Sequence, residues 1–268
     1  MNETALVTGG GRGLGRAIAM ALGQSGRRVA VASRTAAELD ETLALLRAAG
    51  CEAAAIPTDV TSEAAVHRMV ATVTEKLGPI DLLVNNAGVG TPLGPTWETS
   101  AGEWWRNLEV NVKGPMLCCH AVLPGMIERG HGCIVNVASG AGAASFPYMS
   151  AYVTAKAALI RFTEVLADEL RPHGVAVFAI RPGTVRTAMA EELLQSEEGK
   201  RWLPWFQKIF DEGRDISSKP AEDLILHLAS GQADALSGRM FAAPGAPGNL
   251  AGQTERILKE DLNVLRMR

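Results

Sequence analysis

The segment TALVTGGGRGLGRAIAMALGQS, residues 4–25, decides the fold class. It begins as a short apolar strand, continues as a glycine-rich turn and then shows the apolar spacing of a helix from residue 16 to residue 25. This order lets backbone N–H groups and the positive end of the helix approach a pyrophosphate. The alternative is a flexible loop that merely collects glycine. We favour a nucleotide site that includes Gly9, Gly11, Arg12, Gly13, Leu14 and Gly15.

Strand and helix patterns alternate along the rest of the chain. Strands are expected at 28–33, 51–57, 80–85, 133–138, 175–180 and 237–242, and helices at 35–49, 62–77, 101–128, 151–171 and 220–230. Strands separated by helices of this length imply right-handed crossovers and a parallel sheet. The length suits one large domain as well as two small ones. We favour a single α/β domain over residues 1–268, a Rossmann-type doubly wound fold with a mostly parallel sheet.

Composition favours a small-molecule partner. With 47% hydrophobic residues in 268, the chain can bury a full core, and the net charge of −3 leaves no basic footprint for nucleic acid. The four cysteines lack the spacing of a metal site, so we expect buried free thiols, no metal and a reducing compartment. Neither a leader nor a long apolar run is present, which predicts a soluble cytoplasmic protein without membrane contact.

The end of the second strand bears on cofactor choice. A site selective for NAD places an acid there to bind the ribose 2′-hydroxyl, but this chain has Ser33 and Arg34. A cation would instead pair with a 2′-phosphate, and Arg12 could approach the same group. These residues favour NADP(H) over NAD(H), although Arg34 could also simply begin the solvated face of the next helix.

Two further segments follow predicted strands. Asp59 and Val60 come after the third strand, and Asn86, Ala87 and Gly88 come after the fourth. Open α/β folds bind ligands at this carboxyl edge, so both segments are candidates for the site. For Asn86 and Gly88, a plain turn is the alternative.

The chemistry is expected between residues 139 and 156. Tyr152 and Lys156 are four apart on a predicted helix and therefore share a face. A cation at ~4 Å and an effective dielectric of ~20 is worth ~4 kcal/mol, enough to lower the pKa of the tyrosine by roughly three units. Tyr152 would then be a general acid/base at neutral pH. Ser139 ends the fifth strand, unlike Ser145 and Ser150, and its hydroxyl could polarise a carbonyl.

Gly114-Pro115 interrupts the predicted helix at 101–128. A proline lacks the N–H that the carbonyl of Asn111 would accept, so this carbonyl is expected to be free and able to hold a water for a proton relay. The alternative is a purely structural kink.

After the sixth strand the pattern becomes irregular at about 188–218. Apolar and aromatic residues recur there, which suggests a substrate wall or lid, although tryptophans also serve as ordinary packing. The tail, residues 243–268, begins with a Pro/Gly-rich link and ends in an amphipathic segment that could pack on its own subunit or on a neighbour.

Together these segments resemble the short-chain dehydrogenase/reductase family, in its short branch of about 250 residues. The matching motifs are Thr8-Gly-x-x-x-Gly-x-Gly15, Asn85-Asn-Ala-Gly88, Asn111, Ser139, Tyr152-x-x-x-Lys156 and Pro182-Gly183 with Thr187. The resemblance implies a seven-stranded sheet, a nicotinamide cofactor and commonly a homotetramer, or a homodimer.

The resemblance also implies roles for the matched residues. Tyr152 would exchange a proton, Lys156 would hold the nicotinamide ribose and lower the Tyr152 pKa, Ser139 would bind the carbonyl, and Asn111 would anchor the relay water. Val185 and Thr187 would contact the nicotinamide carboxamide. Asp59 and Val60 would face the adenine, and Asn86 would face the ribose side of the adenine. We therefore expect an NADP(H)-dependent oxidoreductase of a partly apolar carbonyl or secondary alcohol. A catalytically silent NAD(P)-binding regulator and a structural subunit that binds no nucleotide are the alternatives.

Overall fold

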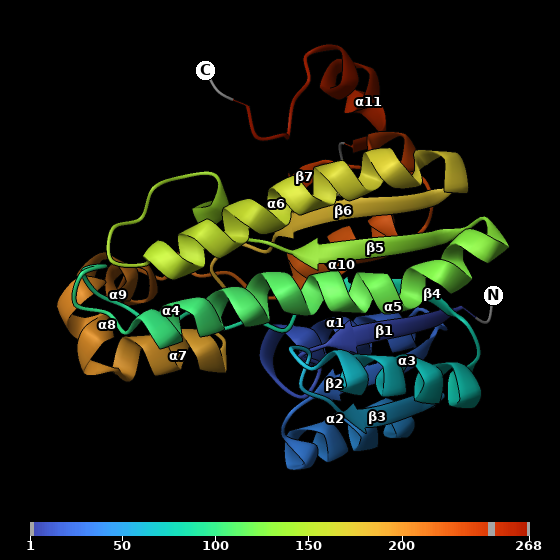
Figure 1. Ribbon diagram of the computed structural model, residues 1–268, viewed down its shortest axis with the longest axis horizontal. Coiled ribbons are helices and arrows are strands. Elements are labelled where there is room, and N and C mark those ends of the chain that lie inside the picture. Colours follow the sequence, from blue (N-terminus) through green and yellow to red (C-terminus); the bar gives the residue numbers. More distant parts are fainter. Residues whose placement is uncertain (1–2, 246–249, 267–268) are drawn as a thin grey trace.

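The computed structural model describes residues 3–245 and 250–266. Seven strands alternate with helices along these residues (Figure 1). The strands are β1 Thr4–Thr8, β2 Arg28–Ser33, β3 Ala53–Pro57, β4 Ile80–Asn85, β5 Gly132–Val137, β6 Val175–Arg181 and β7 Met240–Ala242. The main helices are α1 Gly13–Gln24, α2 Ala36–Ala48, α3 Glu63–Leu77, α4 Ala101–Leu108, α5 Gly114–Arg129, α6 Ser150–Leu170, α7 Ala188–Gln195, α8 Glu197–Trp202, α9 Pro204–Asp211, α10 Lys219–Leu228 and α11 Leu250–Lys259.

The sheet is entirely parallel, in the order β3-β2-β1-β4-β5-β6-β7. The chain adds strands first on one side of β1 and then on the other. The crevice between the ends of β1 and β4 is therefore the point where a doubly wound sheet binds its ligand. This arrangement confirms the predicted Rossmann-type fold and brings the glycine turn beside the Asn86 segment.

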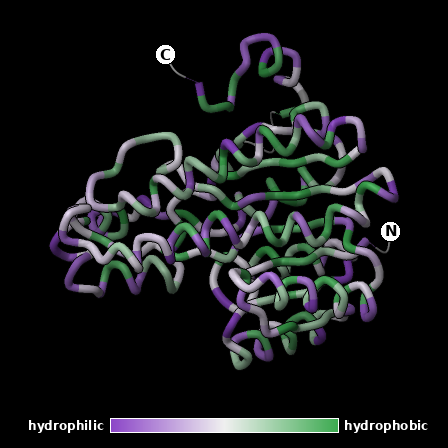
Figure 2. The backbone as a smooth tube through the Cα atoms, viewed as in Figure 1, coloured by the Kyte–Doolittle hydropathy of each residue, from purple (hydrophilic) through white to green (hydrophobic). Residues whose placement is uncertain are grey.

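Helices cover both faces of the sheet because its strands are apolar on both faces. Along β1, Ala5 and Val7 pack with α1, α2 and α10, whereas Leu6 packs with α3, α5 and α6. Hydrophobic residues accordingly concentrate along the strands and on the inner sides of the helices (Figure 2). The helix starts follow local signals as well, since the Ser62 hydroxyl accepts a hydrogen bond from the N–H of Ala65 and caps α3.

The long helix predicted at 101–128 is two helices joined by a π turn, Glu109–Lys113, which contains Asn111. The interruption lies directly before Gly114-Pro115, where the missing proline N–H prevents regular α-helical hydrogen bonding. Pro124 lies inside α5, which continues through it to Arg129.

The irregular segment predicted at about 188–218 contains α7, α8 and α9, which gather at one end of α4 and α6 (Figure 1). Strand boundaries differ slightly from expectation, since β7 is only Met240–Ala242 and a 3-10 turn, Asp234–Leu236, precedes it. In the tail, Leu265 packs against Ile160 and Ala179, so this part covers its own subunit. The Pro/Gly-rich link at 246–249 lies outside the described residues.

Candidate active site

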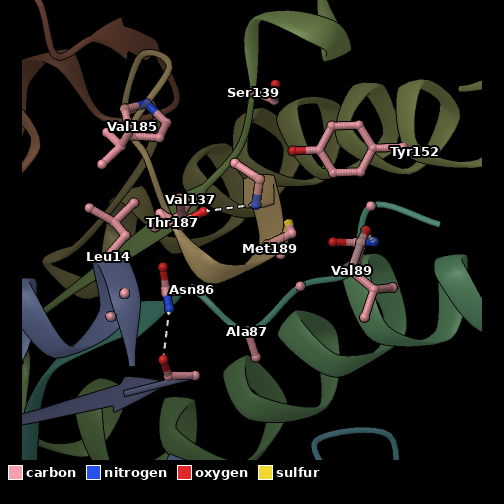
Figure 3. A pocket seen from close by; sticks show the side chains of 18 of the residues that line it. Leu14, Asn86, Ala87, Val89, Val137, Ser139, Tyr152, Val185, Thr187 and Met189 are labelled. Carbon is pink, nitrogen blue, oxygen red and sulfur yellow. Dashed lines mark hydrogen bonds between the residues drawn. The ribbon is translucent and has the colours of Figure 1, made fainter. Parts of the chain in front are cut away.

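Thr8 joins the ends of β1 and β4. Its hydroxyl accepts hydrogen bonds from the N–H groups of Asn86 and Ala87, both at 3.1 Å. The Asn86 side-chain amide in turn donates to the carbonyls of Thr8, at 3.0 Å, and Gly9, at 3.2 Å. Figure 3 shows Asn86 at the edge of the pocket with one hydrogen bond from its side chain. These bonds hold the glycine turn against the segment after β4, and they give Asn86 a structural task that its sequence position alone did not reveal.

The glycine turn leaves its backbone uncovered. Gly13 has φ +54°, a conformation that favours glycine, and a Cβ built on Gly15 would lie 2.1 Å from the carbonyl oxygen of Gly9. The turn opens onto the cavity with α1 directly behind it. A strand end, an uncovered glycine backbone and a helix N-terminus suit the pyrophosphate of a dinucleotide.

One cavity of about 710 Å³ runs along the carboxyl edge of the sheet. Every residue predicted for the site from sequence lines this cavity: Gly9, Gly11, Arg12, Gly13, Leu14, Gly15, Ser33, Arg34, Asp59, Val60, Asn86, Ala87, Gly88, Asn111, Ser139, Tyr152, Lys156, Val185 and Thr187. The fold therefore brings together groups from eight separate segments of the chain.

The end of the cavity near β2 and β3 carries charged groups. Arg12 forms ion pairs with Glu38, at 3.4 Å, and with Glu192 of α7, at 2.8 Å, while Arg34 is exposed to solvent. Glu38 and Glu192 were not identified from sequence, because neither lies at a strand end. Both carboxylates compete for the guanidinium that was expected to approach a 2′-phosphate.

Asp59 is held by Arg106, which reaches it from α4. Its carboxylate accepts hydrogen bonds from Thr61 at 2.8 and 2.9 Å and from Arg106 at 3.2 Å. Burial opposes ionisation, but these hydrogen bonds and the positive charge of Arg106 hold the pKa of Asp59 below its usual value. Sequence reasoning missed Arg106, since nothing in α4 alone indicates which strand end it faces.

Ser139, Tyr152 and Lys156 meet at the opposite end, beyond β5. The hydroxyl of Tyr152 points toward the part of the pocket where Ser139 lies (Figure 3). Lys156 is buried and donates a hydrogen bond from Nζ to the carbonyl of Val137 at 2.9 Å, and this Nζ lies 5.6 Å from the centre of the Tyr152 ring. A phenol, a serine hydroxyl and an amino group thus share one corner of the cavity.

The predicted direction of the Tyr152 pKa shift is wrong in this structure. Burial raises the pKa of Tyr152, and the hydrogen bond with Ser139 offsets only part of that increase. The ring packs against an apolar cluster that includes Met149 and Leu203, and removing water disfavours the phenolate. Burial also lowers the pKa of Lys156 to about 8, so the amine loses its proton at a lower pH than an exposed lysine does.

Asn111 approaches Lys156 from the π turn. Its side-chain amide donates to the carbonyls of Val89, at 2.9 Å, and Asn107, at 3.1 Å. Its Oδ1 atom is buried without a hydrogen-bond partner among the described residues. A Cβ placed on Gly88 would lie 2.7 Å from this oxygen and 3.7 Å from Lys156 Nζ, so the three groups converge. The unpaired acceptor beside Lys156 among the described residues is this side-chain oxygen, and the role expected for the main-chain carbonyl of Asn111 stays a prediction.

A buried network of polar side chains connects the strands β4 and β5 to α6, the helix that carries Tyr152 and Lys156. Asn85 Nδ2 donates to Asn136 Oδ1 at 2.9 Å, and Asn136 Nδ2 donates to Thr163 Oγ1 at 2.9 Å. The three side chains are at most 2% exposed and join β4, β5 and α6. Such a network fixes α6, and hence Tyr152 and Lys156, relative to the strand that ends at Ser139.

Apolar residues line the cavity beside Tyr152. They are Val89, Gly90, Phe146, Met149, Met189, Ala190, Leu193, Leu203, Trp205, Phe206 and Ile209. The residues from 189 onward lie in the region expected to form a substrate wall. Trp202, which belongs to the same region, stacks on Tyr148 with ring centres 4.6 Å apart.

The model of the short chain dehydrogenase family matches residues 3–198 of this chain. The chain belongs to the short-chain dehydrogenase family. It is accordingly an NAD(P)-dependent oxidoreductase that acts on alcohol and carbonyl groups. Its relatives are named dehydrogenases and reductases.

Some relatives match this short-chain dehydrogenase over nearly their whole length. The 2-(S)-hydroxypropyl-CoM dehydrogenase 3 of Xanthobacter autotrophicus is 34% identical over 91% of this chain and 96% of its own. A short chain dehydrogenase of Pseudocercospora fijiensis is 39% identical, but the match spans only 61% of that longer protein.

Solved structures share the fold. An actinorhodin polyketide ketoreductase with NADPH has a TM-score of 0.84 and 34% identity, covering 93% of this chain and 97% of the other. An NAD⁺-bound xylitol dehydrogenase has a TM-score of 0.81 and 30% identity, covering 90% and 96%. Both cofactors thus occur among structures similar to this short-chain dehydrogenase.

Residues 3–245 and 250–266 include no group of three or more His, Cys, Asp or Glu that could hold a metal ion. Over the same residues, each helix is too short or too polar to cross a bilayer. Cys118 and Cys119 are buried as expected, whereas Cys51 and Cys133 are only half-buried.

Proposed function

We propose that this short-chain dehydrogenase is an NADP(H)-dependent reductase of ketones, and dehydrogenase of the corresponding secondary alcohols, with Tyr152 as its general acid/base. The observation that carries the proposal is the convergence of Ser139, Tyr152 and Lys156 at one corner of a cavity whose other end is a glycine turn. A dinucleotide extended along the sheet edge would present its nicotinamide to this corner.

The bound cofactor supplies the hydride, and the residues orient the carbonyl and move the proton. The Ser139 hydroxyl binds the carbonyl oxygen, and Tyr152 donates its proton to the same oxygen as negative charge develops there. The raised pKa of Tyr152 keeps the phenol protonated at neutral pH, which suits carbonyl reduction. Lys156 and the unpaired Asn111 Oδ1 support a relay that returns a proton to Tyr152.

Substitution of Tyr152 tests the chemical role. Tyr152→Phe keeps the ring and its packing but removes the proton donor, so turnover should fall by roughly 10²- to 10⁴-fold. NADPH affinity, measured by fluorescence titration, should change little. Wild-type turnover in this variant would contradict the assignment.

The preference for NADP(H) rests on Arg34 and Arg12 at the β2 end of the cavity. Arg34→Asp should weaken NADPH much more than NADH, because only NADPH carries the 2′-phosphate. Equal weakening of both cofactors would mean that the arginine does not bind this phosphate. Glu38 and Glu192 pair with Arg12 and so oppose its binding to the 2′-phosphate. The dissociation constants of NADPH and NADH therefore measure the size of the preference.

A silent regulator would bind NADPH yet oxidise none of it across a broad ketone panel, and a structural subunit would not gain thermal stability from NADPH. The presence of all four residues, Asn111, Ser139, Tyr152 and Lys156, favours the enzyme, because a sensor has no need of the proton-transfer set. Assembly as a homotetramer or homodimer and a cytoplasmic location are parts of this proposal that sedimentation and fractionation would test.

A further inference from the structure

The substrate end of the cavity has an aromatic wall formed by Phe146, Trp205 and Phe206. The ring centres of Phe146 and Trp205 are 5.3 Å apart, and those of Trp205 and Phe206 are 5.6 Å apart. Phe146 precedes α6 and the other two belong to α9, so the wall joins segments that are far apart in the chain. All three line the cavity.

The aromatic wall lies next to the reacting corner. Phe146, Phe206 and the Tyr152 ring pack against the same apolar cluster, which includes Met149 and Leu203. A substrate whose carbonyl oxygen meets the Tyr152 hydroxyl must therefore direct its remaining atoms along these side chains.

The wall retains apolar surface that the protein itself does not cover. Trp205 is 38% exposed, and Phe146 and Phe206 are half-buried, although each faces a cavity. Apolar surface held open in a concave site is typical of a ligand contact, and covering it with an apolar group is favourable.

Lys156 is the charged lining residue beside Tyr152, where its Nζ donates a hydrogen bond to the carbonyl of Val137, and the other charged lining residues lie elsewhere. Arg12, Arg34, Glu38, Asp59 and Arg106 belong to the β2 and β3 end of the sheet, across the cavity from the segments that follow β5 and β6.

Arg181 is the charged lining residue at the β6 end, where its side chain lies beside Gly140 and is exposed to solvent. An ionised substrate group against the aromatic wall would lose water without gaining a partner charge there, which is costly.

We infer that the substrate is an uncharged ketone, or the corresponding secondary alcohol, that carries an aromatic ring next to the carbonyl. This inference rests on the proposed function and adds the substrate class. The ring stacks on the aromatic wall while the carbonyl reaches Ser139 and Tyr152. Planar apolar rings gain from offset or edge contacts with such a wall beyond the area they bury.

The experiment compares three ketones with the NADPH-loaded enzyme: 4′-methylacetophenone, its anionic analogue 4-acetylbenzoate, and 2-butanone. We expect kcat/KM for 4′-methylacetophenone to exceed each of the others by at least about tenfold. Trp205→Ala and the milder Phe206→Leu should lower the value for the aryl ketone by about tenfold and that for 2-butanone much less. Trp97→Ala is the matched control, because Trp97 is 84% exposed and does not line the cavity.

Binding is measured separately, by calorimetric titration of the NADP⁺-loaded protein with 4′-methylacetophenone and with 4-acetylbenzoate. If no ketone is reduced, the proposed function fails, whereas the ratio of these two dissociation constants still decides the inference. Tighter binding of the anion, lost in Arg181→Ala, would overturn it. Equal kcat/KM for the aryl ketone and 2-butanone, or no effect of either wall variant, would also overturn it.

Discussion

Lys156 should make the stability of the unliganded protein rise in mildly alkaline solution. Burial lowers its pKa from an ordinary value of 10.5 to about 8. The unfolded chain therefore binds this proton more tightly than the folded chain, and below pH 8, where both are protonated, the cost of the buried charge is fully present. As pH rises through 8 toward 10.5, only the folded protein loses the proton, so the free energy of unfolding increases.

The magnitude follows from these two pKa values. Between pH 7 and pH 9.5 the lysine contributes a gain of about 2 kcal/mol in the free energy of unfolding. Lys156→Met removes the titrating group and also the hydrogen bond to the carbonyl of Val137. The loss of this hydrogen bond lowers the free energy of unfolding by the same amount at every pH. The difference in the free energy of unfolding between wild type and variant should thus increase by about 2 kcal/mol from pH 7 to pH 9.5. The raised pKa of Tyr152 makes that residue titrate only at higher pH.

Urea unfolding at half-unit pH intervals measures this difference, because the other titrating groups cancel between the two proteins. Lys113→Met is the control, since Lys113 lies on the same helical layer but is exposed. It should leave the pH slope unchanged. A wild-type minus Lys156→Met difference that stays flat, or falls, between pH 7 and pH 9.5 would refute the reasoning.

Two further variants test the supports of the site. Gly15→Ala places a methyl group 2.1 Å from the carbonyl oxygen of Gly9, so it should destabilise the protein by at least about 1–3 kcal/mol and abolish NADPH binding in a fluorescence titration; wild-type affinity would argue against the tight glycine turn. Thr163→Val leaves the buried amide of Asn136 without its acceptor and should lower the free energy of urea unfolding by about 1–3 kcal/mol. Thr72→Val, which loses only a solvent-exposed hydrogen bond to the carbonyl of Arg68, should change this free energy by less than about 0.5 kcal/mol. Equal effects of the two threonine variants would contradict a stabilising role of the buried network.

The position of the site could be predicted because it depends on strand ends. In a parallel sheet every strand delivers its last residue to the same edge, so Ser139 and Asp59 had to share that edge once the alternation of strands and helices was recognised. Tyr152 and Lys156 followed from helical spacing. For these residues, local order in the chain was sufficient.

Contacts between segments that are distant in the sequence could not be predicted from the spacing of residues along the chain. The ion pair between Arg12 and Glu192 joins residues 180 positions apart, and the ion pair between Arg106 and Asp59 depends on where α4 lies relative to the loop after β3. The aromatic wall likewise forms only where α9 folds back on the segment before α6. Sequence spacing carries no information about such approaches, because they result from packing of whole elements.

The sequence by itself determined the doubly wound fold, the edge that carries the candidate site and the residues proposed to react there, because these depend on periodicity and on residue order. Only the tertiary structure decided their electrostatics. A nearby lysine alone would lower the pKa of Tyr152, but the structure surrounds the phenol with apolar side chains, and burial also lowers the pKa of Lys156 to about 8. Desolvation depends on everything packed around a group, and that environment exists only after folding.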